Sequence, residues 1–330
     1  MSRSVLPTTD LYFLNSCDQW IGRWWRRRPI ERLGANCFRC GNRLLLIRHD
    51  DPRLMERALH WTGTLVYLID DDIEGAAQSP GLPAAYRERL RRFATDHHDR
   101  LLRRADLLIT SSDILRNRFE QAETVRARIL RLDPVWSLPL ADLRHFGHRG
   151  EASLDIVHLG TASHAGGLAR TTPALLAVLD RFAQTRFTYF GRPGSHPALE
   201  AHPRVRRLDP MDWSRYRRWL PRQRFNLALY PLEPTAFDRA RSSNKIIEHA
   251  IAGAVGVYPR DWRPAAALGQ GAILAPGDPA DWAESLTAAV AQRDLLASRA
   301  AHAATVVRAL NDPGAQRRFW ARTLGIEPPR

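Results

Sequence analysis

Short apolar runs alternate with amphipathic segments in the C-terminal half of the chain. Residues 154–160 (LDIVHLG) form an apolar run ending on glycine, residues 173–184 (PALLAVLDRFAQ) have the period of a helix, and residues 186–191 (RFTYFG) form another apolar run. Further strands are predicted at 224–230 (RFNLALY), 255–259 (VGVYP) and 271–276 (GAILAP), and helices at 243–253 (SNKIIEHAIAG) and 279–294 (PADWAESLTAAVAQRD). This alternation predicts a parallel sheet covered by helices.

The N-terminal half has a similar but less regular pattern. Strands are predicted at 43–49 (RLLLIRH), 62–70 (TGTLVYLID) and 105–111 (ADLLITS), with a basic helical segment between Pro83 and Arg104 and another helix over 111–121 (SSDILRNRFEQ). Residues 131–151 mix proline, glycine and histidine, which places a domain boundary near 145–152. We expect an α/β protein with two Rossmann-like domains, 1–150 and 151–330, facing each other across a cleft, and a last helix that packs back on the N-terminal domain.

The composition supports two domains and a soluble protein. A chain of 330 residues with 44% apolar and 25% charged residues can bury cores for two domains. The first ten residues, MSRSVLPTTD, are polar, and apolar runs such as 63–69 are too short to span a membrane, so we expect a cytoplasmic protein. Cys37 and Cys40 are interpreted as reduced structural thiols, and a metal site that includes Cys17 or His49 is the alternative.

The charge of the chain predicts an anionic partner. A formal net charge of +14 fits nucleic acid, an acidic membrane surface or a phosphorylated substrate. No helix-turn-helix, RNA-recognition or zinc-finger signature is present, so nucleic acid is not the partner that we expect. Among 49 basic residues Lys245 is the only lysine, which suggests that a compact ammonium is needed at this position.

The residues around Lys245 favour binding of a diphosphate. A strand-to-helix loop at the carboxyl edge of a parallel sheet leaves free N–H groups at the helix start, where the helix dipole favours an anion. Arg239 and Arg241 precede the helix, and Glu248 lies three residues after Lys245 on the same helix face. The simpler alternative is a helix capped by Ser242 or Ser243 with a solvated surface ion pair, although Glu248 is not at the position of a capping-box partner.

Residues 226–259 (NLALYPLEPTAFDRARSSNKIIEHAIAGAVGVYP) resemble the donor-binding segment of GT-B glycosyltransferases, in the group 1 or family 4-like superfamily. A subgroup of these enzymes has a Ser-x-x-Lys-x-x-Glu helix start similar to Ser242–Glu248. Residues 158–168 (HLGTASHAGGL) resemble the loop that opens the C-terminal domain, and residues 67–75 with 105–115 resemble the N-terminal domain. The resemblance implies transfer of a sugar from a nucleotide-diphosphate-sugar to a glycan or lipid-linked acceptor, in bacterial surface polysaccharide or glycoconjugate synthesis, without a metal or other cofactor.

The resemblance also implies roles for individual residues. Glu248 would contact the donor ribose, while Asn244 and Lys245 would lie near the diphosphate. The expected donor-binding residues are Gly160, Thr161, Ser163, His164, Arg192, Arg239, Arg241, Ser243, Asn244, Lys245 and Glu248. Lys245 and Glu248 are also catalytic candidates, because charge develops on the departing diphosphate, and Asp71 would orient the acceptor hydroxyl or act as a base.

One position departs from the family pattern. Many retaining members have two glutamates separated by seven residues, and Ala240 occupies the first of these positions here. The stereochemical outcome of the transfer therefore stays open. A glycosyltransferase-like subunit that binds nucleotide-sugar without catalysis is one alternative function, because a fold does not guarantee its chemistry.

Two further segments have more than one interpretation. The Asp-x-Asp spacing of Asp70 and Asp72 is typical of the metal site of GT-A glycosyltransferases, which would make activity metal-dependent. Residues 18–29 (DQWIGRWWRRRP) place Trp20, Ile21, Trp24 and Trp25 on one helical face, with Arg23 and Arg26–Arg28 largely away from it. Such a segment either rests peripherally on the anionic inner face of the cell membrane or packs as a helix with a solvated basic side.

Overall fold

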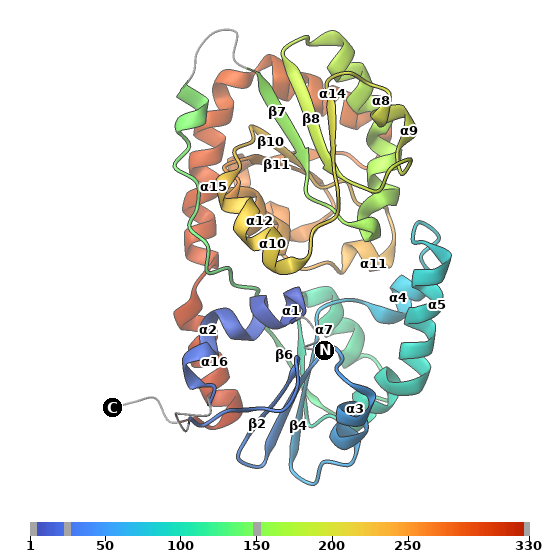
Figure 1. Cartoon of the computed structure of the whole chain (residues 1–330), viewed down its shortest axis with the longest axis vertical. Helices are drawn as coiled ribbons and strands as arrows, with labels where there is room; N and C mark the ends of the chain where they lie inside the picture. The colour runs from blue at the N-terminus through green and yellow to red at the C-terminus, as the bar shows by residue number, and fades with distance from the viewer. Residues whose placement is uncertain (1–4, 23–27, 148–152, 327–330) are drawn as a thin grey trace.

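The computed structural model describes residues 5–22, 28–147 and 153–326. These residues form two six-stranded sheets, one in each half of the chain, with helices on both sides of each sheet (Figure 1). The two domains meet along a single interface near the middle of the molecule. The predicted fold class, with two Rossmann-like domains, is confirmed.

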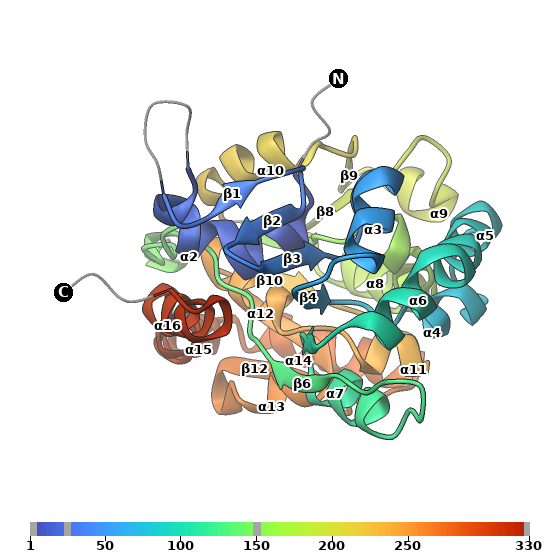
Figure 2. The same cartoon turned by 90° about the horizontal axis from the view of Figure 1, so that it is seen from below.

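The N-terminal sheet has the strand order β1-β2-β3-β4-β5-β6, and Figure 2 shows its strands from β1 at one edge to β6 at the other. The bounds are β1 Glu31–Arg32, β2 Cys37–Cys40, β3 Arg43–Ile47, β4 Thr64–Ile69, β5 Leu107–Thr110 and β6 Arg128–Arg131. Strands β3 to β6 are parallel, whereas β1, β2 and β3 pair in antiparallel fashion. Cys37 and Cys40 thus lie on an antiparallel strand near the sheet edge, and the described residues hold no cluster of three or more metal-ligating side chains.

The first four helices of the N-terminal half precede its sheet, and the others follow the predicted strands. They are α1 Pro7–Thr9, η1 Asp10–Leu14, α2 Asn15–Cys17, η2 Asp18–Trp20, α3 Pro52–Leu59, α4 Ile73–Gln78, α5 Ala84–Phe93, η3 Ala94–His98, α6 Asp99–Arg104 and α7 Asp113–Glu120. Trp20 and Ile21 are buried in the core, as expected for a packed segment. The other two residues of that predicted aromatic face, Trp24 and Trp25, lie outside the described residues.

The C-terminal sheet has the order β12-β11-β10-β7-β8-β9, and all of its strand pairs are parallel. Its strands are β7 Leu154–His158, β8 Thr185–Phe190, β9 Val205–Leu208, β10 Leu227–Leu229, β11 Val255–Pro259 and β12 Ala272–Ala275. The chain moves outward from β7 to β9 and then returns to β10 on the other side of β7. The loops after β7 and β10 therefore diverge and leave a crevice, which is where open parallel sheets bind ligands.

The helices of the C-terminal half are more numerous than the sequence pattern predicts. They are η4 Arg144–Gly147, η5 Ala162–His164, α8 Ala165–Arg181, α9 Pro197–Glu200, α10 Trp213–Trp219, η6 Leu220–Arg222, α11 Ala236–Arg239, α12 Asn244–Ile251, α13 Arg263–Ala266, η7 Gly269–Gly271, α14 Pro279–Ala291, η8 Arg293–Leu295, α15 Leu296–Leu310 and α16 Pro313–Leu324. Helix α8 begins eight residues before the predicted start at Pro173. This proline lies inside the helix rather than in its first turn, where proline is usually found.

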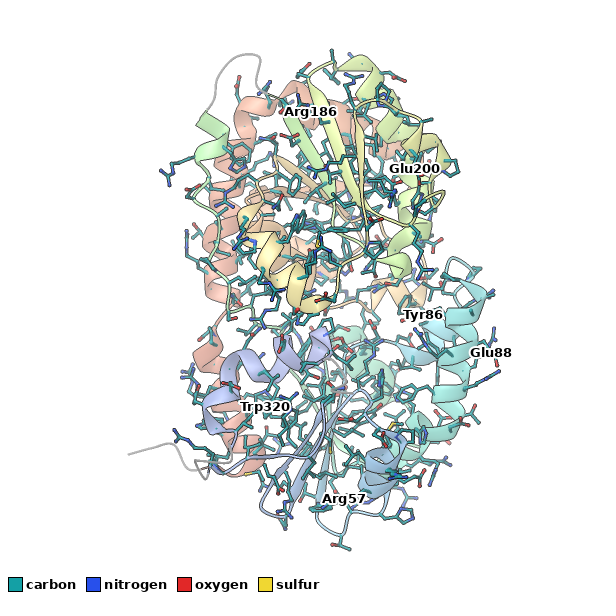
Figure 3. All side chains as sticks on the ribbon, in the orientation of Figure 1. Arg57, Tyr86, Glu88, Arg186, Glu200 and Trp320 are labelled. Atoms are coloured by element: carbon teal, nitrogen blue, oxygen red, sulfur yellow. The ribbon has the colours of Figure 1, made fainter. Side chains whose placement is uncertain are left out.

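The last helix, α16, crosses back to the N-terminal half. Its Gln316 donates a hydrogen bond of 3.0 Å to the carbonyl of Leu11, and the indole of Trp320 donates one of 2.6 Å to the carbonyl of Tyr12 (Figure 3). The Phe13 ring packs edge-on to Trp320, with centroids 5.1 Å apart. None of the helices in the described parts of the chain has the length and apolar composition needed to cross a membrane.

We expect Trp320→Ala to lower the free energy of unfolding by about 3–5 kcal/mol, because it removes a fully buried aromatic side chain. Leu295→Ala is the control, since Leu295 is 48% exposed and its truncation should change the free energy by less than about 0.5 kcal/mol. Chemical denaturation followed by far-ultraviolet circular dichroism measures both. Equal effects of the two substitutions would contradict this packing of α16.

Candidate functional site

A cavity of about 700 Å³ lies between the two domains, at the carboxyl ends of both sheets. The C-terminal domain contributes the loops after β7, β8 and β9 together with α10 and the start of α12. The N-terminal domain contributes the segment 6–12 and the residues that follow β3 and β4. The cavity therefore occupies the crevice that the strand order predicts.

Gly160 allows the loop after β7 to pack closely against the side chain of His158. A Cβ on this residue would overlap Nε2 of His158. The Nδ1 atom of His158 donates a hydrogen bond of 3.2 Å to the carbonyl of Leu229, so the ring is held in one orientation. Burial, together with nearby Lys245, lowers the pKa of His158 to about 3, and the ring is neutral at physiological pH.

Lys245 and Glu248 form a buried ion pair at the start of α12. The Nζ atom of Lys245 lies 2.6 Å from Oε2 of Glu248 and also donates a hydrogen bond to the carbonyl of Leu159. The second carboxylate oxygen, Oε1, accepts a hydrogen bond from the hydroxyl of Tyr216. Glu248 is only 2% exposed, so the alternative of a solvated surface pair is wrong. Ser243 is the N-cap residue of α12, but its side chain makes no capping hydrogen bond.

A second cation, Arg241, lies beside this pair. Its Nε donates to Oδ1 of Asp238 at 3.0 Å, and its Nη2 donates to the carbonyl of Ser163 at 3.0 Å. His164 lines the same cavity at the start of α8, with its ring 5.3 Å from that of Tyr230. Burial, Arg241 and Lys245 lower the pKa of His164 well below its usual value. Two cations, each paired with one carboxylate, thus line the cavity together with two helix N-termini, and the N-termini favour an anionic ligand.

On the N-terminal side of the cavity, the charges of two aspartates are balanced by an arginine. Arg48 has a left-handed backbone, with φ of 59°, and its guanidinium pairs with Asp71 at 2.8 Å and with Asp70 at 3.3 Å. Thr8 donates a hydrogen bond of 2.6 Å to Asp70. Burial raises the pKa of Asp70, while Arg48 opposes this shift. A left-handed arginine costs on the order of 1 kcal/mol, and such strain is typical of functional sites.

Asp72 points away from the cavity. Its carboxylate caps α4 by accepting a hydrogen bond of 2.8 Å from the amide of Gly75, and it pairs with Arg118. Asp70 and Asp72 therefore do not converge on one point as a pair of metal ligands would.

The structure brings most of the predicted site residues together. The cavity is lined by Asp71, Gly160, Thr161, Ser163, His164, Arg192, Arg241, Asn244, Lys245 and Glu248. Arg239 and Ser243 are the exceptions, because they line a separate cavity of about 220 Å³ between the domains. Arg239 lies at the end of the short helix α11, which directs its side chain to the surface, where it donates to the carbonyl of Pro234.

Ala240 also lies away from the cavity. It is 2% exposed and packs among core residues of the N-terminal domain, and its carbonyl accepts a hydrogen bond of 2.7 Å from Ser112. Ala240 is thus part of the domain interface and not of the cavity.

Several residues of the cavity were not predicted, among them Tyr12, Arg48, Trp213 and Tyr216. The last two belong to α10 (WSRYRRW), in which aromatic residues recur every third position, and this spacing is a signal that the sequence did carry. Nothing local marks Tyr12 or Arg48, because both reach the cavity only through the packing of distant elements.

No protein-family model and no curated protein matches this sequence. Solved structures do match. An alpha,alpha-trehalose-phosphate synthase (UDP-forming) from Burkholderia vietnamiensis is 14% identical, with a TM-score of 0.57 over 85% of this chain and 74% of that one. HepE from Anabaena, solved with UDP and glucose, is 16% identical, with a TM-score of 0.58 over 85% and 77% of the two chains. These neighbours are GT-B glycosyltransferases.

The chain has the GT-B fold. A sucrose-phosphate synthase from Thermosynechococcus elongatus agrees, with 12% identity and a TM-score of 0.55 over 82% of this chain and 69% of the other. The predicted resemblance to GT-B enzymes is confirmed at the level of the fold. The alternative of a GT-A-like enzyme does not agree with this fold. It also requires Asp70 and Asp72 to bind one metal ion, whereas Asp70 pairs with Arg48 and Asp72 caps α4.

We expect Gly160→Ala to lower the free energy of unfolding by about 1–3 kcal/mol, because the new methyl group displaces the His158 ring. Gly277→Ala is the matched control, since nothing lies within 4 Å of a Cβ at that position, and it should be neutral or slightly stabilising. Thermal denaturation of the two variants measures the difference. A Gly160→Ala variant as stable as Gly277→Ala would mean that the loop does not approach His158 in this way.

Proposed function

We propose that this protein is a glycosyltransferase that moves a sugar from a nucleotide-diphosphate-sugar to an acceptor hydroxyl. The observation that carries the proposal is the convergence of Lys245, Arg241 and the N-termini of α8 and α12 on the cleft of a GT-B fold. HepE was solved with UDP and glucose, and pneumococcal GtfA with UDP and GlcNAc, which supports a nucleotide-sugar as the ligand.

The mechanism follows from the charges that develop during transfer. The bond between the anomeric carbon and the diphosphate oxygen breaks, so negative charge builds up on the departing diphosphate. Lys245, Arg241 and the free amides at the helix starts stabilise this charge because they are oriented before the reaction begins. Glu248 accepts hydrogen bonds from the donor ribose, and Asn244 and His164 lie beside the donor.

The acceptor binds against the N-terminal domain in this proposal. Asp71 faces the cavity and is held by Arg48, so it orients the acceptor hydroxyl or takes its proton. We propose a glycan or lipid-linked acceptor of bacterial surface polysaccharide or glycoconjugate synthesis, with peripheral contact to an anionic membrane. The net charge of +14 supports an anionic surface as partner.

A second candidate is a nucleotide-sugar-binding subunit without catalysis. The burial of Ala240 in the domain interface favours it, because a carboxylate found in many retaining enzymes is missing there. The two candidates differ in one measurable respect, since only the transferase consumes the donor.

A thermal-shift screen of UDP-, GDP-, ADP-, dTDP- and CMP-sugars tests the proposal. One of them should raise the melting temperature in a concentration-dependent way, because a ligand that binds only the folded state stabilises it. Incubation with that donor should then release the free nucleotide. Binding without release would favour the non-catalytic subunit, and salt-sensitive binding of DNA or RNA without nucleotide-sugar binding would overturn both candidates.

We expect Lys245→Ala to weaken binding of the nucleoside diphosphate about 10–100-fold, because a charged hydrogen-bond donor is lost. The substitution also leaves Glu248 unpaired in a buried place, so chemical denaturation of the same variant measures the accompanying loss of stability. Arg239→Ala, which removes an exposed arginine outside the cleft, should leave the affinity within about twofold of wild type. Titration calorimetry measures the affinity, and an unchanged affinity in folded Lys245→Ala would reject the role of this lysine.

Donor hydrolysis or transfer should continue in excess EDTA. We propose metal-independent catalysis because Lys245 and Arg241 supply the positive charge that a metal ion supplies elsewhere. Nucleotide release is followed with and without added Mn²⁺ or Mg²⁺. Complete loss of activity in EDTA that the metal ion restores would contradict the proposal.

A further inference from the structure

Each carboxylate oxygen of Glu248 has a charged or polar neighbour in this structure. Its Oε2 pairs with Lys245 at 2.6 Å, and its Oε1 accepts the hydroxyl of Tyr216. Both neighbours line the cavity with it. A buried carboxylate needs such partners, because an isolated charge in this environment is strongly destabilising. Tyr216 therefore helps to determine in which direction Glu248 presents its remaining lone pairs.

Tyr216 is carried by α10, whose inner side is aromatic. The Tyr216 ring stacks between Trp213 and Trp219, with centroids 6.1 and 5.8 Å away, and it meets Phe190 edge-on at 5.9 Å. Burial and the Glu248 carboxylate raise the pKa of Tyr216 well above its usual value. Its hydroxyl is thus a hydrogen-bond donor throughout the physiological pH range.

Helix α10 is held by the N-terminal domain rather than by its own domain alone. The carboxylate of Asp10, in η1, accepts hydrogen bonds from the indole of Trp213 at 2.5 Å and from Arg217 at 2.6 Å. Asp10 is only 8% exposed, so these bonds are shielded from solvent. The same carboxylate oxygen thus holds the first turn and the middle of the helix on either side of Tyr216.

A second contact joins this arrangement to the start of α12. Trp136, in the segment between the two domains, packs against Trp213 with centroids 5.2 Å apart. Its indole donates a hydrogen bond of 2.6 Å to Oδ1 of Asn244. Asn244 and Glu248, about one turn apart on α12, are therefore hydrogen-bonded to Trp136, which packs against α10, and to Tyr216, which belongs to it.

We propose that Tyr216 is a positioning residue for ribose recognition, and that Asp10 of the N-terminal domain holds it against Glu248. The proposal rests on the proposed function, in which Glu248 receives the ribose hydroxyls. It adds that the specificity of the C-terminal domain for a ribonucleotide depends on a carboxylate of the other domain. Separation of the domains would release α10 and loosen Glu248, so ribose recognition is complete only while the two domains are in contact.

The test compares a nucleotide that has its ribose hydroxyls with one that lacks them. Titration calorimetry gives the Kd of UDP and of 2′,3′-dideoxy-UDP, or of the corresponding guanosine pair if GDP gives the larger shift in the screen. Wild-type protein should prefer the ribonucleotide by about 10-fold or more, as expected for hydrogen bonds to a charged group. In Tyr216→Phe this preference should fall by a factor of several, while the Kd of the dideoxy nucleotide changes by less than about threefold.

Tyr189→Phe is the matched control. Tyr189 also donates to a glutamate of the same domain, Glu200, at 3.0 Å, but it does not line the cavity. Figure 3 shows Glu200 at the outer side of this domain, away from the interface. The control should keep the wild-type preference. A preference that is unchanged in Tyr216→Phe, or absent in wild-type protein that binds UDP, would overturn the inference while leaving the proposed function intact.

Asp10→Asn tests the contribution of the other domain. Like Tyr216→Phe, it should lower the preference for UDP over 2′,3′-dideoxy-UDP. The double variant should have the same preference as Tyr216→Phe alone, because Asp10 acts through Tyr216. Trp213→Phe, which removes the indole donor to Asp10 but keeps an aromatic ring, is an independent route if Asp10→Asn is unstable. Equal weakening of both nucleotides by Asp10→Asn would show a merely structural role, and a wild-type protein that binds no nucleotide would refute the proposed function itself.

Discussion

The buried ion pair between Lys245 and Glu248 is the interaction on which the rest of the cleft depends. Two charges removed from water are unfavourable unless further hydrogen bonds complete their coordination. The carbonyl of Leu159 accepts a hydrogen bond from the Lys245 ammonium, and the hydroxyl of Tyr216 donates one to the Glu248 carboxylate. The pair thereby connects three segments at one point, namely the loop after β7, helix α10 and the first turn of α12. A cleft organised in this way offers fixed charge to a ligand without a large rearrangement.

Hydrogen bonds also join the two halves of the chain, because polar groups of one half find their partners in the other. In the N-terminal segment, the carbonyls of Leu11 and Tyr12 accept hydrogen bonds from Gln316 and Trp320 of α16. The carboxylate of Asp10 accepts hydrogen bonds from Trp213 and Arg217 of α10. Asn311 also exchanges two hydrogen bonds with the backbone of Trp136, at 2.7 and 3.0 Å, where the chain crosses back. Buried polar groups left unpaired are costly, so these contacts favour one relative placement of the two domains.

Several elements could be predicted and others could not, for identifiable reasons. The parallel strands β3, β4, β5, β7, β10 and β11 are largely buried on both faces, and such strands appear in a sequence as apolar runs. The edge strands β6 and β9 carry exposed arginines, which hide them among loops. The helical period predicts a helix only from Pro173 onward, whereas α8 begins at Ala165 and has this proline in its ninth position. Arg239 was placed in the site from its proximity to Lys245 in sequence, but the turn of α11 directs it outward.

The sequence by itself determined the fold class and the position of Lys245, Glu248 and the glycine loop, because these depend on hydrophobic period, helix-start geometry and spacing within one element. The tertiary structure alone decided that the ion pair is buried, that Asp72 faces away from the cavity, and that Ala240 belongs to the interface. It also decided which distant residues complete the site. Tyr216 meets Glu248 across 32 residues, and Asp10 meets Trp213 across 203. Contacts at such separations depend on how whole elements pack, and no local pattern in this sequence encodes that packing.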